Sequence, residues 1–250
     1  MRKFLKVFLF LIATYSILLV AFFFVMCQRP EIFSKVMSKT PDVVFMAFPF
    51  KQMWLSARAG TLKLGEQAPD FFLETYDKQA TVQLSRFRGE RPVVLVFGSY
   101  TWPPFRREAP ALNRLYHQYK DRVEFFLIYI QEAHASDAWQ LEVNEKENVI
   151  FGDPQDYETR VNLAGTCLTN LGIEMPALVD TIENRTEIAY TAWPDRIYVV
   201  DSNGRIAFKS DAGPFGFKTE LLSEALGQLL TSENQTGHLP LSIKSLHPSR

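Results

Sequence analysis

The segment from Val93 to Phe105 constrains the fold of this chain more than any other feature. Residues 93–97 form a continuous apolar, valine-rich run, which is typical of a strand buried on both faces of a sheet. A short turn follows, and Pro103-Pro104 then marks the start of a helix. Because a helix N-terminus lowers the pKa of a thiol, a redox enzyme would mount its reactive cysteine here. Trp102 occupies that place, and Phe105 stands where a partner thiol would be.

The rest of the domain alternates strand and helix patterns. We expect strands at 81–84, 92–97, 123–130 and 177–179, helices at 104–119, 158–171 and 217–230, and a hairpin at 196–209. This order predicts an α/β domain with the thioredoxin-like fold, in which a central mixed sheet is flanked by helices. The strands that begin near Val93 and Val123 should then be neighbours.

Residues 7–26 form an uncharged apolar run that is long enough to cross a bilayer as a helix. A cleaved signal peptide and a lipoprotein site at Cys27 are the alternatives. The length of the run and the lack of a small-residue cleavage site before Gln28 argue against the first, and the bulky Met26 argues against the second. We therefore expect a single-pass membrane protein. Basic residues lie on both sides of the run, and their balance slightly favours an inside N-terminus with an exported domain.

These patterns divide the chain into four parts. Residues 1–28 are the membrane anchor, 29–61 a juxtamembrane amphipathic linker, 62–230 the thioredoxin-like domain, and 231–250 a polar tail that we expect to be disordered. The linker is unusually apolar for a free segment. It either packs on the domain or lies at the bilayer surface, and we favour packing.

Composition excludes several classes of function. The formal net charge of -1 offers no basic surface for nucleic acid. The two cysteines, Cys27 and Cys167, cannot form a disulfide framework. Cys167 falls within a predicted amphipathic helix, where a buried structural role is expected. We expect neither a metal site nor a bound cofactor.

Four separated blocks of the domain occur in an order that is characteristic of one family. They are GSYTWPPFR at 98–106, YIQEAHASDAW at 129–139, PALVDT at 176–181 and PDRIY at 194–198. These blocks resemble the iodothyronine deiodinase family. GEQAPDF at 65–71 and LSRFRG at 84–89 resemble the opening of redoxin domains more generally. The resemblance implies an oxidoreductase that acts by reductive dehalogenation or by thiol or selenol redox chemistry, with a thiol donor as reductant.

The resemblance also assigns candidate catalytic residues. Trp102 stands where the family has its nucleophilic selenocysteine or cysteine. His134 should lie at the sheet edge that carries the Trp102 turn, where an imidazolium would donate a proton and a neutral ring would orient a phenolic group. Glu132 would hold the histidine tautomer. The family's second histidine is not apparent, because residues 148–151 are Asn-Val-Ile-Phe, and this weakens the case for an iodothyronine substrate.

Further residues are candidates for substrate binding. Tyr100 and Thr101 precede Trp102 in the reactive turn. Pro194 should lie across from that turn in the cis form. Arg196 resembles an arginine that the family uses near the polar end of its substrate, and a guanidinium suits a carboxylate or phenolate. The implied ligand is a small aromatic or halogenated molecule.

Two classes of function remain open. Selenocysteine is encoded by a codon that some translation tables read as tryptophan, so residue 102 of the native product is either selenocysteine or tryptophan. With selenocysteine the chain would be a deiodinase-like or general thiol/selenol oxidoreductase. With Trp102 it has no nucleophile at this position and would be a redox-dead binding protein that keeps the pocket. The membrane is a partner in either case, and a homodimer is left open.

Overall fold

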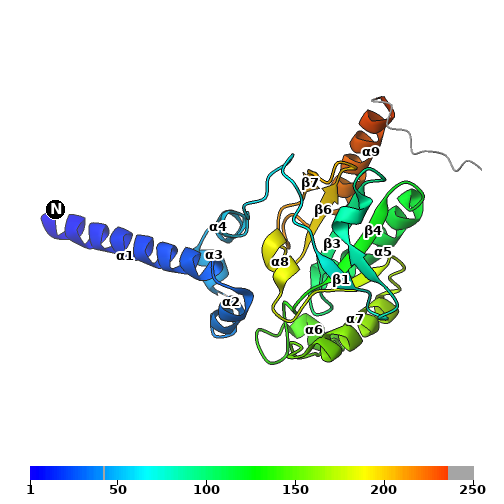
Figure 1. Ribbon diagram of the computed structural model, residues 1–250. Coiled ribbons are helices and arrows are strands. Elements are labelled where there is room, and N and C mark those ends of the chain that lie inside the picture. The colour runs from blue at the N-terminus through cyan, green and yellow to red at the C-terminus, as the bar shows by residue number, and fades with distance from the viewer. Residues whose placement is uncertain (42, 236–250) are drawn as a thin grey trace, which may run out of the picture.

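The computed structural model describes residues 1–41 and 43–235 (Figure 1). At its centre is a mixed sheet with the strand order β5-β4-β3-β6-β7. The strands are β3 (Val93–Gly98), β4 (Glu124–Tyr129), β5 (Ala177–Val179), β6 (Arg196–Val200) and β7 (Ile206–Lys209). β3 runs parallel to β4 and antiparallel to β6, so the predicted pairing of the two central strands is confirmed. Every residue of β3 is buried, as expected of a strand covered on both faces.

Helices cover this sheet. α5 (Pro103–Tyr119) packs on α7 (Tyr157–Leu171) and on α9 (Thr219–Gln235), while α7 contacts β5 and α9 contacts β6 and β7. The shorter elements are β1 (Phe72–Glu74), β2 (Thr81–Gln83), the 3-10 turn η1 (Leu84–Phe87), α6 (Glu142–Lys146) and α8 (Arg185–Tyr190). The predicted thioredoxin-like fold is confirmed, because the order of strands and helices and the mixed sheet are those of that fold.

The predicted elements differ from the observed ones mainly at their ends. α7 begins at Tyr157, because the side chain of Asp156 caps it by accepting a hydrogen bond from the Thr159 N–H. It ends at Gly172, whose φ of 60° is in the left-handed region. The predicted tail is wrong at its start, since α9 continues to Gln235 and residues 231–235 are helical. The rest of the predicted tail, 236–250, lies outside the described residues.

The N-terminal part of the chain extends from the domain as a long helix (Figure 1). This helix, α1 (Arg2–Met26), is the only one in the described part of the chain that is long and apolar enough to cross a membrane. The linker that follows consists of α2 (Pro30–Met37), α3 (Val43–Ala47) and α4 (Phe50–Ala57). The linker is therefore largely helical, which its apolar composition alone does not predict.

Aromatic side chains pack the linker onto the domain. Phe33 of α2 is almost wholly buried, and its ring lies 5.1 Å from Trp54 of α4 and 5.8 Å from both Trp139 and Trp193 of the domain. The Trp54 indole donates a hydrogen bond to the backbone oxygen of Gly213 (2.6 Å). The contacts with Trp139, Trp193 and Gly213 join segments that are more than a hundred residues apart in the sequence, so the linker is a part of the folded unit.

Candidate functional site

The end of β3 brings Trp102 beside His134. Trp102 is the N-cap residue of α5, and Pro103 and Pro104 begin that helix. Proline is favourable there because the first N–H groups of a helix have no intrahelical partner. Since β3 and β4 are parallel, the loops that follow them leave the same edge of the sheet. The indole and imidazole rings stack, with centroids 5.1 Å apart and planes 20° from parallel.

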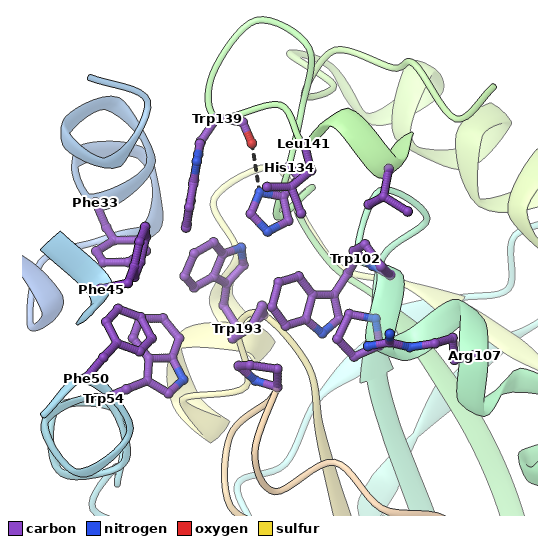
Figure 2. Close-up of a pocket in the computed structure, with 15 residues that line it drawn as sticks. Phe33, Phe45, Phe50, Trp54, Trp102, Arg107, His134, Trp139, Leu141 and Trp193 are labelled. Carbon is purple, nitrogen blue, oxygen red and sulfur yellow. Dashed lines mark hydrogen bonds between the residues drawn. The ribbon is translucent and has the colours of Figure 1, made fainter. Parts of the chain in front are cut away.

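His134 is a neutral hydrogen-bond acceptor in this site. Its Nδ1 lies 2.7 Å from the backbone oxygen of Trp139, and because a carbonyl only accepts, Nδ1 carries the proton. Burial lowers the pKa of His134 to about 4, so the ring is neutral near pH 7. The unprotonated Nε2 is turned toward Trp102 and Trp193 (Figure 2). Of the two predicted roles, a neutral ring fits the orientation of a phenolic group and does not fit proton donation as imidazolium.

Glu132 fastens the Trp102 turn to the loop after β4. Its carboxylate accepts hydrogen bonds from the N–H (2.8 Å) and hydroxyl (2.6 Å) of Thr101 and from the hydroxyl of Tyr129. Burial raises the pKa of Glu132, although these hydrogen bonds act in the opposite direction. The expectation that Glu132 holds the tautomer of His134 is corrected here, because the Trp139 carbonyl is the group bonded to Nδ1.

Tyr100 and Thr101 brace the turn and are not among the residues that line the pocket. The Tyr100 ring packs on Phe151 at 5.4 Å, and its hydroxyl accepts a hydrogen bond from the Asn170 amide (2.9 Å). The backbone oxygen of Thr101 accepts from the Asn144 amide (2.9 Å). Phe151 belongs to the stretch 148–151, which therefore contributes to the packing of the turn. These contacts fix the turn that carries Trp102, and a substrate-binding role for Tyr100 and Thr101 stays a prediction.

Pro194 and Arg196 have different surroundings. The Trp193–Pro194 peptide is cis, as predicted, and both of its residues line the pocket. The Arg196 guanidinium is buried and donates to the backbone oxygens of Arg58 and Ala59 (3.4 Å for Ala59). Arg196 does not line the pocket. In this structure it holds the end of the linker, and its contact with the polar end of a ligand stays a prediction.

Asp195 is a candidate that the sequence patterns did not distinguish. It is wholly buried, and neither of its carboxyl oxygens makes a hydrogen bond within the described residues. Burial raises its pKa to about 8, while the neighbouring Trp102 indole N–H acts to lower it without making a hydrogen bond of ordinary geometry. Asp195 thus keeps a proton at neutral pH beside position 102. The sequence feature that could have indicated Asp195 is an acidic residue placed between Pro194 and a mainly apolar strand.

One apolar pocket of about 330 Å³ lies between the linker and the domain (Figure 2). All four tryptophans of the chain line it, namely Trp54, Trp102, Trp139 and Trp193. The other lining residues are Phe33, Phe45, Phe50, Pro103, Pro104, Arg107, His134, Leu141, Val143, Pro194 and Pro214. A mostly aromatic wall with few polar groups suits a small aromatic molecule.

Neither cysteine supplies a thiol to this pocket. Cys167 is buried, and burial raises the pKa of its thiol, so it remains protonated and unreactive. This agrees with the predicted structural role. Cys27 is exposed just after α1 and does not line the pocket. Among residues 1–41 and 43–235, no group of three His, Cys, Asp or Glu side chains is placed to hold a metal ion.

Comparison with known proteins identifies the family. The chain matches the family model for iodothyronine deiodinase over residues 1–229. It belongs to the iodothyronine deiodinase family. The thyroxine 5-deiodinase of Gallus gallus is 29% identical over 205 residues, which cover 80% of this chain and 77% of that protein. The thyroxine 5-deiodinase of Aquarana catesbeiana is 32% identical over 198 residues, which cover 77% and 71%.

Other deiodinase-family relatives match a shorter part of the chain. The type I iodothyronine deiodinase of Xenopus laevis is 34% identical over 139 residues, which cover 56% of this chain and 53% of that protein. The predicted resemblance is confirmed, and family and fold together support a function of the oxidoreductase type. The apolar helix α1 and the deiodinase relatives are consistent with a single-pass membrane protein.

Solved structures agree with the fold. A hypothetical protein from Sinorhizobium meliloti 1021 superimposes with a TM-score of 0.51 at 18% identity, covering 69% of this chain and 87% of that one. An uncharacterized conserved protein from Geobacillus kaustophilus gives a TM-score of 0.51 at 20% identity, covering 69% and 85%. At these identities the likeness concerns the fold alone.

Proposed function

We propose that this chain binds a small aromatic ligand in the apolar pocket and, with tryptophan at position 102, carries out no thiol or selenol chemistry there. The observation that carries the proposal is the Trp102 indole, which stacks on His134 and forms a pocket wall at the position of the family's nucleophile. An indole has no sulfur or selenium atom to attack a halogen. The oxidoreductase-type scaffold then serves as a binding site.

The pocket walls define the chemistry of the ligand. A ring placed among Trp102, Trp139 and Trp193 gains about 0.5–1.5 kcal/mol for each well-oriented aromatic pair. His134 presents Nε2 as an acceptor, so it recognises a hydroxyl or N–H group on the ligand. A phenol combines these two features, and a halogenated phenol adds apolar contact area.

Thyroxine is a suitable probe, because it is a halogenated phenol and appears in the names of two relatives. Binding to the full-length chain in detergent micelles is followed by quenching of tryptophan fluorescence. The O-methyl ether of thyroxine lacks the phenolic O–H that would donate to His134, so we expect it to bind about two- to tenfold more weakly. In His134→Phe, which keeps a ring but lacks Nε2, phenol and ether should bind equally. An unsaturable signal, or equal binding of the two compounds by the unmodified chain, would contradict the proposal.

A second candidate function is reductive dehalogenation, and it requires selenocysteine at position 102 of the native product. The observation that favours it is the place of residue 102 at the N-terminus of α5, where an anionic selenolate is stabilised. His134 is neutral and Asp195 does not line the pocket, so the proton that replaces the halogen would come from the thiol donor. A thiol donor would supply the two electrons.

A mass spectrum of the native peptide that contains residue 102 separates the two functions. The mass of an unmodified tryptophan supports the binding protein. A selenium isotope pattern supports reductive dehalogenation and rejects the first proposal. The codon for residue 102 provides an independent reading.

We also propose that the N-terminus lies inside and that the domain is exported. Arg2, Lys3 and Lys6 precede the apolar run, and the amino terminus adds a charge on that side. Arg29 and Lys35 follow the run and reduce the bias. Protease treatment of sealed spheroplasts or vesicles tests this orientation, because an exported domain is digested from outside and an internal one is protected.

A further inference from the structure

Residues 43–50 form an uncharged apolar stretch outside α1. Their sequence is Val-Val-Phe-Met-Ala-Phe-Pro-Phe, bounded by Asp42 and Lys51. None of the eight residues is buried, and Met46 is 82% exposed while Val43 is 59% exposed. Leaving such a surface in water is unfavourable by about 25 cal/mol for each Å² of apolar area. The three phenylalanines of the stretch pack partly on the core, so the exposed face that carries Met46 and Val43 is the part that needs an apolar surrounding from outside the protein.

This stretch lies alongside the middle of α1 and not at its end. The Tyr15 hydroxyl donates a hydrogen bond to the backbone oxygen of Ala47 (3.1 Å), and the Tyr15 ring stacks on Phe48 with centroids 5.5 Å apart. Phe48 also contacts Phe22 at 5.2 Å. Tyr15 precedes Met26, the last residue of α1, by eleven residues. At the helical rise this separation is about 16 Å.

A point about 16 Å from the end of a membrane-spanning helix is near the centre of a hydrocarbon core that is about 30 Å thick. No water is available there, so each backbone polar group needs a partner in the protein. The Tyr15 hydroxyl meets this need for Ala47, and the Phe50 N–H donates to the backbone oxygen of Phe48 (2.7 Å). Pro49 has no N–H to satisfy. The backbone oxygens of Ala47 and Phe48 are thus paired, as a lipid surrounding requires.

We propose that residues 43–50 are a second membrane-embedded segment, a short re-entrant turn that enters the hydrocarbon beside α1 and returns to the domain on the same side. The partner of its exposed face is the acyl chains of the bilayer, because that face continues the apolar surface of α1. Phe45 and Phe50 also line the aromatic pocket, so this wall of the pocket lies at the lipid. The proposal does not depend on what the pocket binds.

The depth of a nitroxide label tests the proposal in the full-length chain reconstituted into phosphatidylcholine vesicles. Met46→Cys places the label on the exposed face, in a Cys27→Ser background that removes the other accessible thiol, while Cys167 is buried. Leu18→Cys in α1 and Leu64→Cys in the domain are controls, and both positions are more than half exposed. We expect the label at 46 to be relaxed by oxygen and protected from a water-soluble nickel complex, as at 18 and unlike 64.

Two results would overturn the proposal. One is a nickel response at Met46 equal to that at Leu64, which would place the segment in water. The other is a depth at the lipid–water boundary, which would mean that the segment lies on the membrane surface. Val43→Cys repeats the reading at a second exposed position, so a local disturbance by the label at 46 does not decide the outcome.

Discussion

Replacing Asp195 with asparagine should remove a large pH-dependent contribution to the stability of the domain. Burial raises the pKa of Asp195 to about 8, whereas the carboxyl group has an ordinary value of 3.8 in the unfolded chain. Between these two values the folded carboxyl keeps its proton and the unfolded one loses it. The free energy of unfolding therefore falls as the pH rises, by about 1.4 kcal/mol for each pH unit. Asparagine has nearly the same shape and does not ionise, so Asp195→Asn lacks this dependence.

Between pH 5 and pH 8 the effect amounts to about 4 kcal/mol, or about 8–16 °C in Tm for a domain of this size. Thermal unfolding of the full-length chain in detergent micelles, followed by tryptophan fluorescence, measures it. We expect the difference in Tm between Asp195→Asn and the wild type to grow in favour of the variant as the pH rises from 5 to 8. Burial raises the pKa of Glu187 to about 7, but Glu187 is present in both proteins, so its contribution cancels in the difference between their Tm values. A Tm difference that is constant with pH would refute the reasoning, because Asp195 would then ionise normally in the folded state.

Three other experiments have defined outcomes. Burial lowers the pKa of His134 to about 4, so its NMR signals should not titrate between pH 5 and 8, and a midpoint within that range would contradict the neutral ring. Phe33→Ala should cost about 3–5 kcal/mol in thermal unfolding, whereas Ile32→Ala, at an exposed position of α2, should cost little; equal losses would count against the buried contact. Trp102→Cys should give a thiol that iodoacetamide labels with a pKa below about 8.5, and an ordinary titration would argue against an activating site.

The local parts of the fold could be predicted from the sequence. β3 was predictable because residues 93–97 are apolar throughout, and the start of α5 because Pro103-Pro104 favours a first helical turn. The meeting of Trp102 with His134 followed from topology, since parallel strands bring their loops to one sheet edge. The part of the linker in the pocket was not predictable. An apolar stretch such as 43–50 has the same pattern whether it contacts protein or lipid.

The hydrogen-bond partners of the polar candidate residues could not be predicted from the sequence either. A motif places Glu132 and Arg196 in the chain, but their hydrogen bonds depend on groups that only the folded structure brings near them. Glu132 meets Thr101 and Tyr129, and Arg196 meets backbone oxygens of the linker. The pKa of Asp195 has the same origin, because it is set by burial among distant segments and not by its neighbours in sequence.

One titration tests the central claim, that residue 102 is a wall of a binding pocket and not a nucleophile. The full-length chain, with Trp102 established by intact mass, receives the iodinated phenol probe in the presence of excess dithiol. Tryptophan fluorescence and iodide release are measured in the same sample. We predict saturable quenching with no more iodide than a sample without protein releases. Iodide release that increases with protein concentration would contradict the claim, and so would the absence of saturable quenching.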